Sequence, residues 1–436
     1  MPGLFVLLLL CLGPTDDFAA RVHEFDLANG LHGIVYVDSS APVVSVNVYY
    51  KVGSYYEPPG KTGLSHMLEH MSFKRTDIYR PGDFDRILDS VGAQNNGFTS
   101  TFYTGYYEDF AQDRWDLGLV LEAARMGRCV FPDSEFESEH QVVWEERRLH
   151  ENRPVSIFWE YLDATVFLAN PQRNPTIGWA DDVARYRVED IRNWYNRYYN
   201  PANAVLVVAG MVDTADVRTR AEKYFGALAG RPAPDFDAYA IEPPQHGERR
   251  FVVRRRVSQP QVVLAFHTPG VRDSFHLVGD VVAGIIGRGR SSRLYRQLVV
   301  KNRLCTSVWA WNSVEQDPGA LYIGFQPVRE SDIPRIERII EQELARLGSE
   351  LATERELERV RNQELASEMF DRDDVSDVAY FLATYHITRG HWREFLRERK
   401  RVMAVTREQV RDFSRTYLTP EKRTVGLLLP ETKGTR

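Results

Sequence analysis

Two histidines and a glutamate stand close together in the segment GLSHMLEHMSFK, residues 63–74. If this segment is helical, His66 and His70 are one turn apart and share a face, so both imidazoles can bind one metal ion. Glu69 lies beside that face, where its carboxylate can take a proton from a water molecule held by the ion. Zinc lowers the pKa of such a water to about 7. The spacing therefore predicts a zinc site in which Glu69 is the general base.

The same three residues could instead be solvated groups on a surface helix, because H-x-x-E-H also arises by chance. The neighbouring residues argue against this alternative, since Leu64, Met67, Leu68 and Met71 make much of the helix apolar. A buried histidine needs a polar partner, and a metal ion supplies one. The order H-x-x-E-H is also a known zinc protease pattern. We therefore expect metal-dependent hydrolysis.

A catalytic zinc takes three protein ligands and keeps a fourth position open. The acidic segment SEFESEHQVVWEERRLHENRP, residues 134–154, contains the candidates for the third ligand. Glu139 and Glu146 are seven residues apart, or two helical turns, and share a face. Glu145 is rotated by about 100° from Glu146, so only one of these two can face the site. The residue pattern does not choose among them, and a solvated acidic helix is the alternative.

The elements that must position these residues alternate between strands and helices. HEFDLANGLHGIVYVDS predicts two strands joined at Asn29-Gly30, a strong hairpin signal. Residues 41–53 alternate in polarity and predict a half-buried strand, with Ser45 and Asn47 on its polar face. Thr62 is placed to cap the helix that carries the histidines. Further helices are expected at 82–91, 115–129, 134–150, 155–168 and 188–199, and a buried strand at 203–210.

The second half of the chain repeats the pattern of the first. Residues 259–270 resemble 41–53, residues 335–368 resemble 115–150, and residues 423–430 resemble 203–210. A period of about 200 residues indicates a duplicated α+β domain. We place the N-terminal domain at 21–228, a Pro- and Gly-rich linker at 229–247, and the C-terminal domain at 248–436. SFHLVGDVVAGIIG replaces H-x-x-E-H in the second half, so we expect metal only in the first.

The composition is that of a soluble globular protein of 436 residues with a net charge of −6, which gives no reason to expect a nucleic-acid partner. The apolar run from Leu4 to Leu12 has the length of a signal-peptide core, and Ala19 and Ala20 suit cleavage near residue 20. We expect a signal peptide at 1–20 and export, in a bacterium to the periplasm. A misassigned start or a loose apolar tail is the alternative, and the chain would then be cytoplasmic. No later segment is apolar enough to cross a membrane, and we interpret Cys129 and Cys305 as interior residues.

GLSHMLEHMSFK followed by the VVWEERR helix resembles the pitrilysin or insulinase-like zinc metallopeptidases, including the mitochondrial processing peptidase and its bacterial relatives. In that family the third ligand is a glutamate about 75 residues beyond the second histidine, which selects Glu146. Glu139 matches the family's glutamate that orients the site. The resemblance implies one Zn²⁺ and two homologous α+β domains, each with a mostly antiparallel sheet backed by helices, which form half of a clamshell.

The segment VGAQNNGFTSTFYTGYY, residues 91–107, resembles a further family block, although Gly97 stands where alanine is usual. The resemblance implies that a peptide substrate pairs with an edge strand near residues 95–101, with Asn96 close to the scissile bond. The alternative for residues 95–97 is a plain turn. Blocks at 198–213 and 287–298 also match, so the resemblance covers nearly the whole mature chain.

One segment departs from the family pattern. Members that cleave alone carry an arginine and, seven residues later, a tyrosine that polarise the substrate carbonyl, but LVVKNRLCTSV has Val299 and Thr306 there. Arg296 and Arg303 lie nearby, on other helical faces. Some bacterial relatives divide these groups between two subunits, so the resemblance implies a heterodimer whose homologous partner supplies the Arg/Tyr pair. A dedicated precursor-processing peptidase and a non-catalytic structural subunit are the alternatives.

Overall fold

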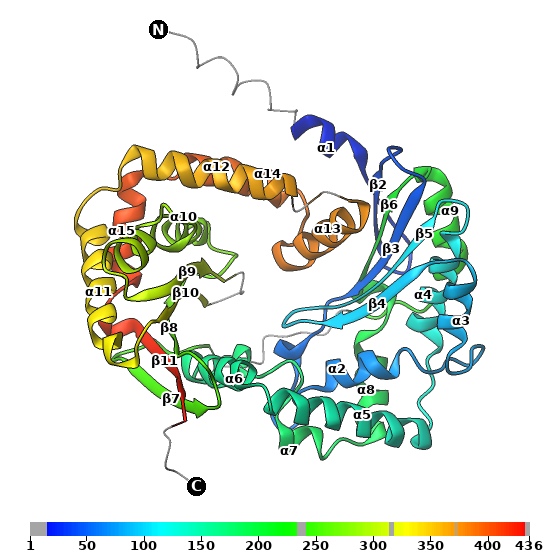
Figure 1. The fold of residues 1–436 in the computed structure, drawn as a ribbon. Helices are drawn as coiled ribbons and strands as arrows, with labels where there is room; N and C mark the ends of the chain where they lie inside the picture. The colour runs from blue at the N-terminus through cyan, green and yellow to red at the C-terminus, as the bar shows by residue number, and fades with distance from the viewer. Residues whose placement is uncertain (1–14, 233–240, 314–317, 371, 373, 432–436) are drawn as a thin grey trace. The chain divides into compact units, whose positions relative to one another are not determined.

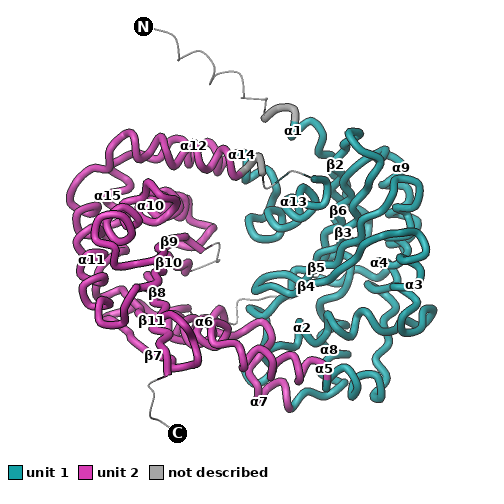
Figure 2. The backbone as a smooth tube through the Cα atoms, in the orientation of Figure 1, with its two compact units in different colours: residues 1–141, 185–235, 370–396 teal, residues 142–184, 236–369, 397–436 magenta. Residues whose placement is uncertain are grey.

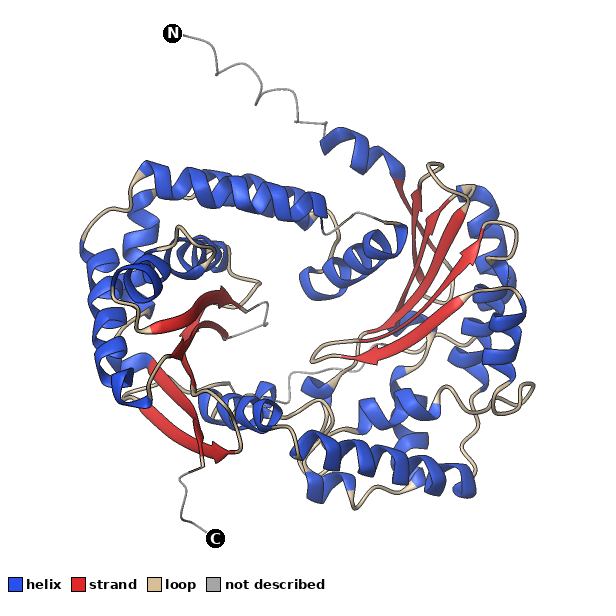
Figure 3. Ribbon diagram, in the orientation of Figure 1, coloured by secondary structure: helices blue, strands red, loops and turns tan. Residues whose placement is uncertain are grey.

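The structure is a computed structural model that describes residues 15–232, 241–313, 318–370, 372 and 374–431 (Figure 1). The apolar run 4–12 of the predicted signal peptide lies outside the described residues. The chain is α+β, as expected, with two sheets and many helices (Figure 3). The helices are α1 (Thr15–Arg21), α2 (Leu64–Met71), α3 (Asp83–Ser90), α4 (Asp116–Arg128), α5 (Asp133–Glu151), α6 (Pro154–Val166), α7 (Ala180–Val183), α8 (Val188–Tyr198), α9 (Thr214–Phe225), α10 (His276–Gly287), α11 (Ile333–Ser349), α12 (Glu354–Phe370), α13 (Val375–Arg389), α14 (Glu394–Ala404) and α15 (Arg407–Tyr417).

The two sheets have matching strand orders apart from β1 (Val22–Asp26), an additional edge strand of the first sheet. The first runs β1, β2 (His32–Val37), β6 (Ala204–Gly210), β3 (Val43–Tyr50), β5 (Thr104–Ala111), β4 (Gln94–Thr99). The second runs β7 (Arg249–Arg255), β11 (Arg423–Pro430), β8 (Gln261–Thr268), β10 (Gly319–Pro327), β9 (Cys305–Asn312). Both sheets are antiparallel except for one parallel pair in the same place, β2 with β6 and β7 with β11. This shared topology confirms the predicted duplication, and the β1–β2 hairpin is also present.

The packing divides the chain into two units that do not follow the chain order (Figure 2). Unit 1 contains residues 1–141, 185–235 and 370–396, and unit 2 contains residues 142–184, 236–369 and 397–436. In unit 1, α13 from the second half of the sequence covers one face of the first sheet. In unit 2, α6 from the first half covers one face of the second sheet. The two halves of the sequence thus exchange equivalent helices. The predicted domain boundaries, 21–228 and 248–436, describe the two sequence repeats and stay a prediction.

The exchanged helix α13 corrects the prediction of a half-buried strand at 41–53. Val44, Val46 and Val48 are buried on one face of β3, as expected. Ser45 and Asn47 on the other face are also buried, because α13 lies over them and Ser376 Oγ is 3.3 Å from Ser45 Oγ. The polar pair satisfies itself, since Asn47 Nδ2 donates to Ser45 Oγ at 2.8 Å. The polar face of β3, with Ser45 and Asn47, can therefore lie in the interior because its polar atoms are hydrogen-bonded.

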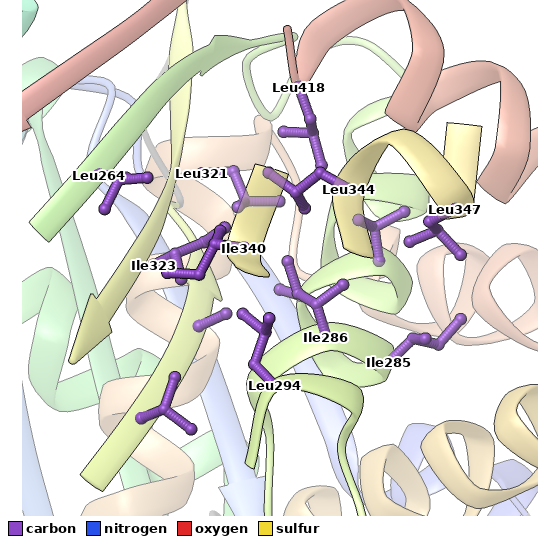
Figure 4. Packing of buried hydrophobic residues seen from close by; sticks show 14 of the residues in the cluster. Leu264, Ile285, Ile286, Leu294, Leu321, Ile323, Ile340, Leu344, Leu347 and Leu418 are labelled. Atoms are coloured by element: carbon purple, nitrogen blue, oxygen red, sulfur yellow. The ribbon is translucent and has the colours of Figure 1, made fainter. Parts of the chain in front are cut away.

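The core of unit 2 shows how the second sheet is held. Leu264, Leu321 and Ile323 project from β8 and β10 and meet side chains of α10 and α11, among them Ile286 and Ile340 (Figure 4). α10 occupies the place where the first half has the histidine motif, and its residues from His276 to Gly287 are buried except Asp280. The helix in the second half therefore serves packing, since burial of its apolar side chains stabilises the fold.

Candidate metal centre

The helix that carries the histidines is anchored at its start by a buried acid. Gly63, the residue before α2, adopts the left-handed conformation with φ 88°, which favours glycine. The carboxylate of Glu57 accepts hydrogen bonds from the backbone N–H groups of Gly63 and Ser65. The capping position is Gly63, which corrects the prediction that Thr62 caps this helix, and Glu57 accepts from backbone donors at its start.

The orientation of α2 follows from its apolar face. Leu64, Met67, Leu68 and Met71 are buried and turn the opposite side of the helix, with His66 and His70, towards α5. The rings of His66 and His70 have centroids 4.7 Å apart and an interplanar angle of 67°. The one-turn spacing read from the sequence thus places both imidazoles on one face.

Glu146 completes a group of three metal-ligating side chains. Ligand atoms of His66, His70 and Glu146 all lie within 4.8 Å of one another. Among the described residues, these three form the one group of three or more side chains that could hold a metal ion. Zinc bonds of about 2.0–2.1 Å in a tetrahedral site put ligand atoms roughly 3.3–3.4 Å apart, so small side-chain movements would suffice. Two imidazoles and one carboxylate are the donor set of known catalytic zinc sites. These residues fit the ion that the sequence predicts.

Ion pairs along α5 set its rotation. This continuous helix begins in unit 1, and its last turns are assigned to unit 2. Arg147 is buried and pairs with Glu160, with Nη2 at 3.1 Å from Oε2, which fixes one side of the helix. Glu145 forms an exposed ion pair with Arg148 at 2.9 Å. Of the two neighbouring glutamates, Glu145 and Glu146, it is Glu146 whose carboxylate lies close to the two histidines.

Glu139 supports the ligand pair from two turns earlier on α5. Its Oε1 lies 3.0 Å from His70 Nδ1, so that nitrogen donates to the carboxylate and Nε2 is the remaining ring nitrogen for a metal. Its other oxygen contacts Lys74 Nζ. Burial raises the pKa of the Glu139 carboxyl, but the hydrogen bonds from His70 and Lys74 outweigh burial and lower it below its ordinary value. Glu139 is therefore a charged acceptor that holds the His70 ring.

The general-base candidate, Glu69, is nearly buried on the same helix. Its side chain is 8% exposed, and its Oε2 accepts a hydrogen bond from Thr99 Oγ1 at 2.7 Å. Thr99 is the last residue of β4, so this bond joins the histidine helix to the edge of the sheet. Sequence reasoning missed Thr99 and Glu57, because no local pattern connects either residue to the histidine motif.

Asn96 lies in β4, the edge strand of the first sheet, opposite Tyr107. The alternative of a plain turn at residues 95–97 is therefore wrong. Gly97 is explained by packing, since a Cβ there would lie 2.8 Å from the Phe73 ring and 3.0 Å from that of Tyr106. Among the described residues β4 pairs only with β5. Such an edge can accept an extended peptide, but contact of Asn96 with a substrate stays a prediction.

The segment that departs from the family pattern has Val299 and Thr306 at the positions where arginine and tyrosine are usual. Val299 lies in the π-helical turn Tyr295–Lys301 and packs against the core of unit 2. Thr306 lies in β9, where its hydroxyl is 3.4 Å from the Gln326 carbonyl oxygen. The sequence suggested a helical position for Arg303, but Arg303 follows the π-helical turn and has a φ of 52°.

Cys129 and Cys305 are free, buried thiols, and burial raises the pKa of each to about 12.

Comparison with known proteins identifies the family of this chain. Residues 34–179 match the family model "Insulinase (Peptidase family M16)", and residues 186–364 match "Peptidase M16 inactive domain". Zinc protease PqqE of Helicobacter pylori is 32% identical over 396 residues, which is 88% of each chain. The chain belongs to peptidase family M16. The predicted resemblance to the insulinase-like zinc peptidases is thereby confirmed.

Other M16-like proteins are similar to this chain over most of its length. An uncharacterized zinc protease of Bacillus subtilis, YmxG, is 25% identical over 357 residues, covering 81% of this chain and 85% of the relative. The crystal structure of a protease from Helicobacter pylori has a TM-score of 0.86 and 28% identity, covering 94% of this chain and all of that one. The crystal structure of the periplasmic protease PqqL of Escherichia coli has a TM-score of 0.79 and 17% identity. The match covers 94% of this chain and 47% of that chain, and it shows similarity of the fold. None of the helices among the described residues combines the length and apolar character needed to span a bilayer.

Proposed function

We propose that this chain is a zinc-dependent endopeptidase that cleaves peptides or unfolded segments. The observation that supports this most directly is the group formed by His66, His70 and Glu146, with Glu69 on the same helix as the histidines. Relatives named zinc proteases share the family. One Zn²⁺ held by these three side chains would acidify a water molecule and polarise the substrate carbonyl.

The chain's own residues have separate tasks in this proposal. His70 binds as a neutral imidazole because its Nδ1–H is donated to Glu139. Glu146 contributes a negative charge that offsets part of the charge of the ion. Glu69 takes a proton from the attacking water and later gives it to the leaving amine. The peptide pairs with the β4 edge beside Asn96, so backbone hydrogen bonds rather than side chains would hold it.

The stabilisation of the oxyanion would come from a second subunit. Val299 has no hydrogen-bond donor, and the short hydroxyl of Thr306, 3.4 Å from the Gln326 carbonyl oxygen, replaces neither a charged guanidinium nor a phenol. A donor to the oxyanion is worth roughly 10²–10³ in rate. We therefore propose a heterodimer with a homologous subunit that carries the Arg/Tyr pair and lacks H-x-x-E-H. Export to the periplasm, directed by residues 1–20, is part of the same proposal.

A Glu69→Gln substitution tests the catalytic role. The complete chain, alone and with a co-purified homologous subunit, would be assayed for zinc content and for cleavage of quenched peptides. We expect one zinc per chain in both proteins and a loss of cleavage by several powers of ten in the variant. A scaffold subunit would show no difference between them, and cleavage at a family-typical rate by the chain alone would exclude the need for a partner. Cleavage products with one defined motif would favour a dedicated processing peptidase.

A further inference from the structure

The hydroxyl of Thr99 has one hydrogen, and the surrounding distances show where it points. Thr99 Oγ1 is 2.7 Å from Glu69 Oε2 and 3.5 Å from the Ser65 carbonyl oxygen. Hydrogen bonds from hydroxyl groups have lengths of about 2.5–3.0 Å, so the carboxylate is the acceptor. A bond to an ionised oxygen is also stronger than one to a neutral carbonyl. The hydroxyl hydrogen of Thr99 is therefore directed at Glu69.

The threonine itself is held by the sheet. Thr99 is paired with Thr104 of β5, and Thr104 is fully buried. The Thr104 hydroxyl donates to the Val52 carbonyl oxygen at 2.9 Å, and its distance of 3.5 Å from Thr99 Oγ1 is too long for a good bond. Thr104 thus leaves the Thr99 hydroxyl to Glu69. Branching at Cβ restricts the Thr99 rotamer, so backbone pairing fixes the position of its hydroxyl.

We propose that Thr99 is a positioning residue for Glu69, an inference that rests on the proposed function. By engaging Oε2, Thr99 sets the orientation of the carboxylate and assigns the proton transfer to Oε1. In the reaction, an O–H bond of the attacking water breaks, its proton bonds to Oε1, and the water oxygen attacks the peptide carbonyl carbon. The C–N bond then breaks, and the proton passes from Oε1 to the leaving nitrogen. Thr99 keeps its own proton throughout.

The expected effect is on the rate of the chemical step. A general base must lie within about 2.6–3.2 Å of the proton donor, and a displacement of 1 Å can cost 10²-fold in rate. Without the Thr99 hydrogen bond, Glu69 would sample orientations that do not reach the water. Substrate binding at the β4 edge uses backbone groups of that strand, so KM should change little. Zinc binding should also be unchanged, because the hydrogen bonds of the Thr99 hydroxyl within the described part of the chain involve Glu69, Ser65 and Thr104 and none of the three ligands.

Thr99→Val removes the hydroxyl at nearly constant volume, and Thr99→Ser retains it. In the complete chain, with the homologous subunit if cleavage needs it, we expect Thr99→Val to lower kcat about 10–100-fold, with KM within twofold and one zinc per chain. Thr99→Ser should restore at least half of the wild-type kcat. Thr104→Val is the matched control, since it removes a neighbouring hydroxyl bound to a carbonyl, and it should keep the wild-type kcat.

Wild-type kcat in Thr99→Val, or equal losses in Thr99→Val and Thr104→Val, would overturn the proposal. Should Thr99→Val fail to fold, Thr99→Ala adds no atoms and must show the same loss of kcat. Glu69→Gln separates this inference from the proposed function. If Glu69→Gln cleaves normally, the peptidase proposal itself is wrong, whereas loss of cleavage in Glu69→Gln together with full activity in Thr99→Val refutes only the role of Thr99.

Discussion

Replacing His386 with glutamine should remove much of the acid sensitivity of unit 1. His386 lies on α13, where its ring stacks on that of His32 with centroids 4.4 Å apart. Its Nδ1 is buried and accepts no hydrogen bond from the described residues. Burial first, and then the nearby His32, Lys51 and His391, together lower the pKa of His386 to about 3, against an opposing effect of Asp26. His386 therefore docks against the sheet as a neutral ring.

The direction of the pH effect follows from the difference between the folded and unfolded states. The unfolded chain takes up a proton on this histidine near its ordinary pKa of about 6.5, while the folded chain does so only near pH 3. The free energy of unfolding is thus unaffected above pH 6.5 and decreases as the pH falls from 6.5 towards 3. The decrease approaches about 1.4 kcal/mol per pH unit, which gives roughly 2 kcal/mol at pH 5 relative to pH 8.

Urea unfolding followed by circular dichroism at pH 8 and pH 5 would measure this contribution. The wild type should lose about 2 kcal/mol more than His386→Gln between the two pH values. Groups remote from His386 also titrate in this range, but they are common to both proteins and cancel in the difference. His23→Gln, on an exposed position of β1, should behave like the wild type. An equal loss in His386→Gln and the wild type would show that His386 carries no such penalty.

Two further predictions concern the residues that support the metal centre. Glu57→Ala should lower the free energy of unfolding by about 2 kcal/mol, because buried N–H groups at the start of α2 lose their acceptor. Glu57→Gln keeps one acceptor oxygen, so its free energy of unfolding should fall less. Equal urea midpoints for the wild type and both variants would contradict this role of Glu57. Glu139→Gln should weaken zinc binding about 10–100-fold, because the His70 ring loses its charged acceptor. Competition with a chromophoric chelator would measure this affinity, and an unchanged value would mean that Glu139 does not orient His70.

The arrangement of H-x-x-E-H could be read from the sequence because it depends on the geometry of a single helix. Positions 66 and 70 lie one turn apart in any α-helix, and the apolar residues between them fix which face is buried. Glu139 and Glu146 share a face of α5 for the same reason. The duplication was equally visible, since matching strand and helix patterns recur in order. These features are local or repetitive, so one chain is enough to predict them.

The tertiary structure decided what depends on contacts between distant segments. The residue pattern alone left Glu145 and Glu146 open, and only the packing of α5 brings one of them to the histidines. Thr99 and Glu69 are 30 residues apart, and Ser45 and Ser376 are 331 apart, so no periodicity links them. Ser45 and Asn47 have the polarity of a solvated face, yet a helix from the other half of the chain buries them. Local polarity reports how a side chain would meet water, whereas burial is decided by which distant element packs over it and whether its polar atoms find partners there.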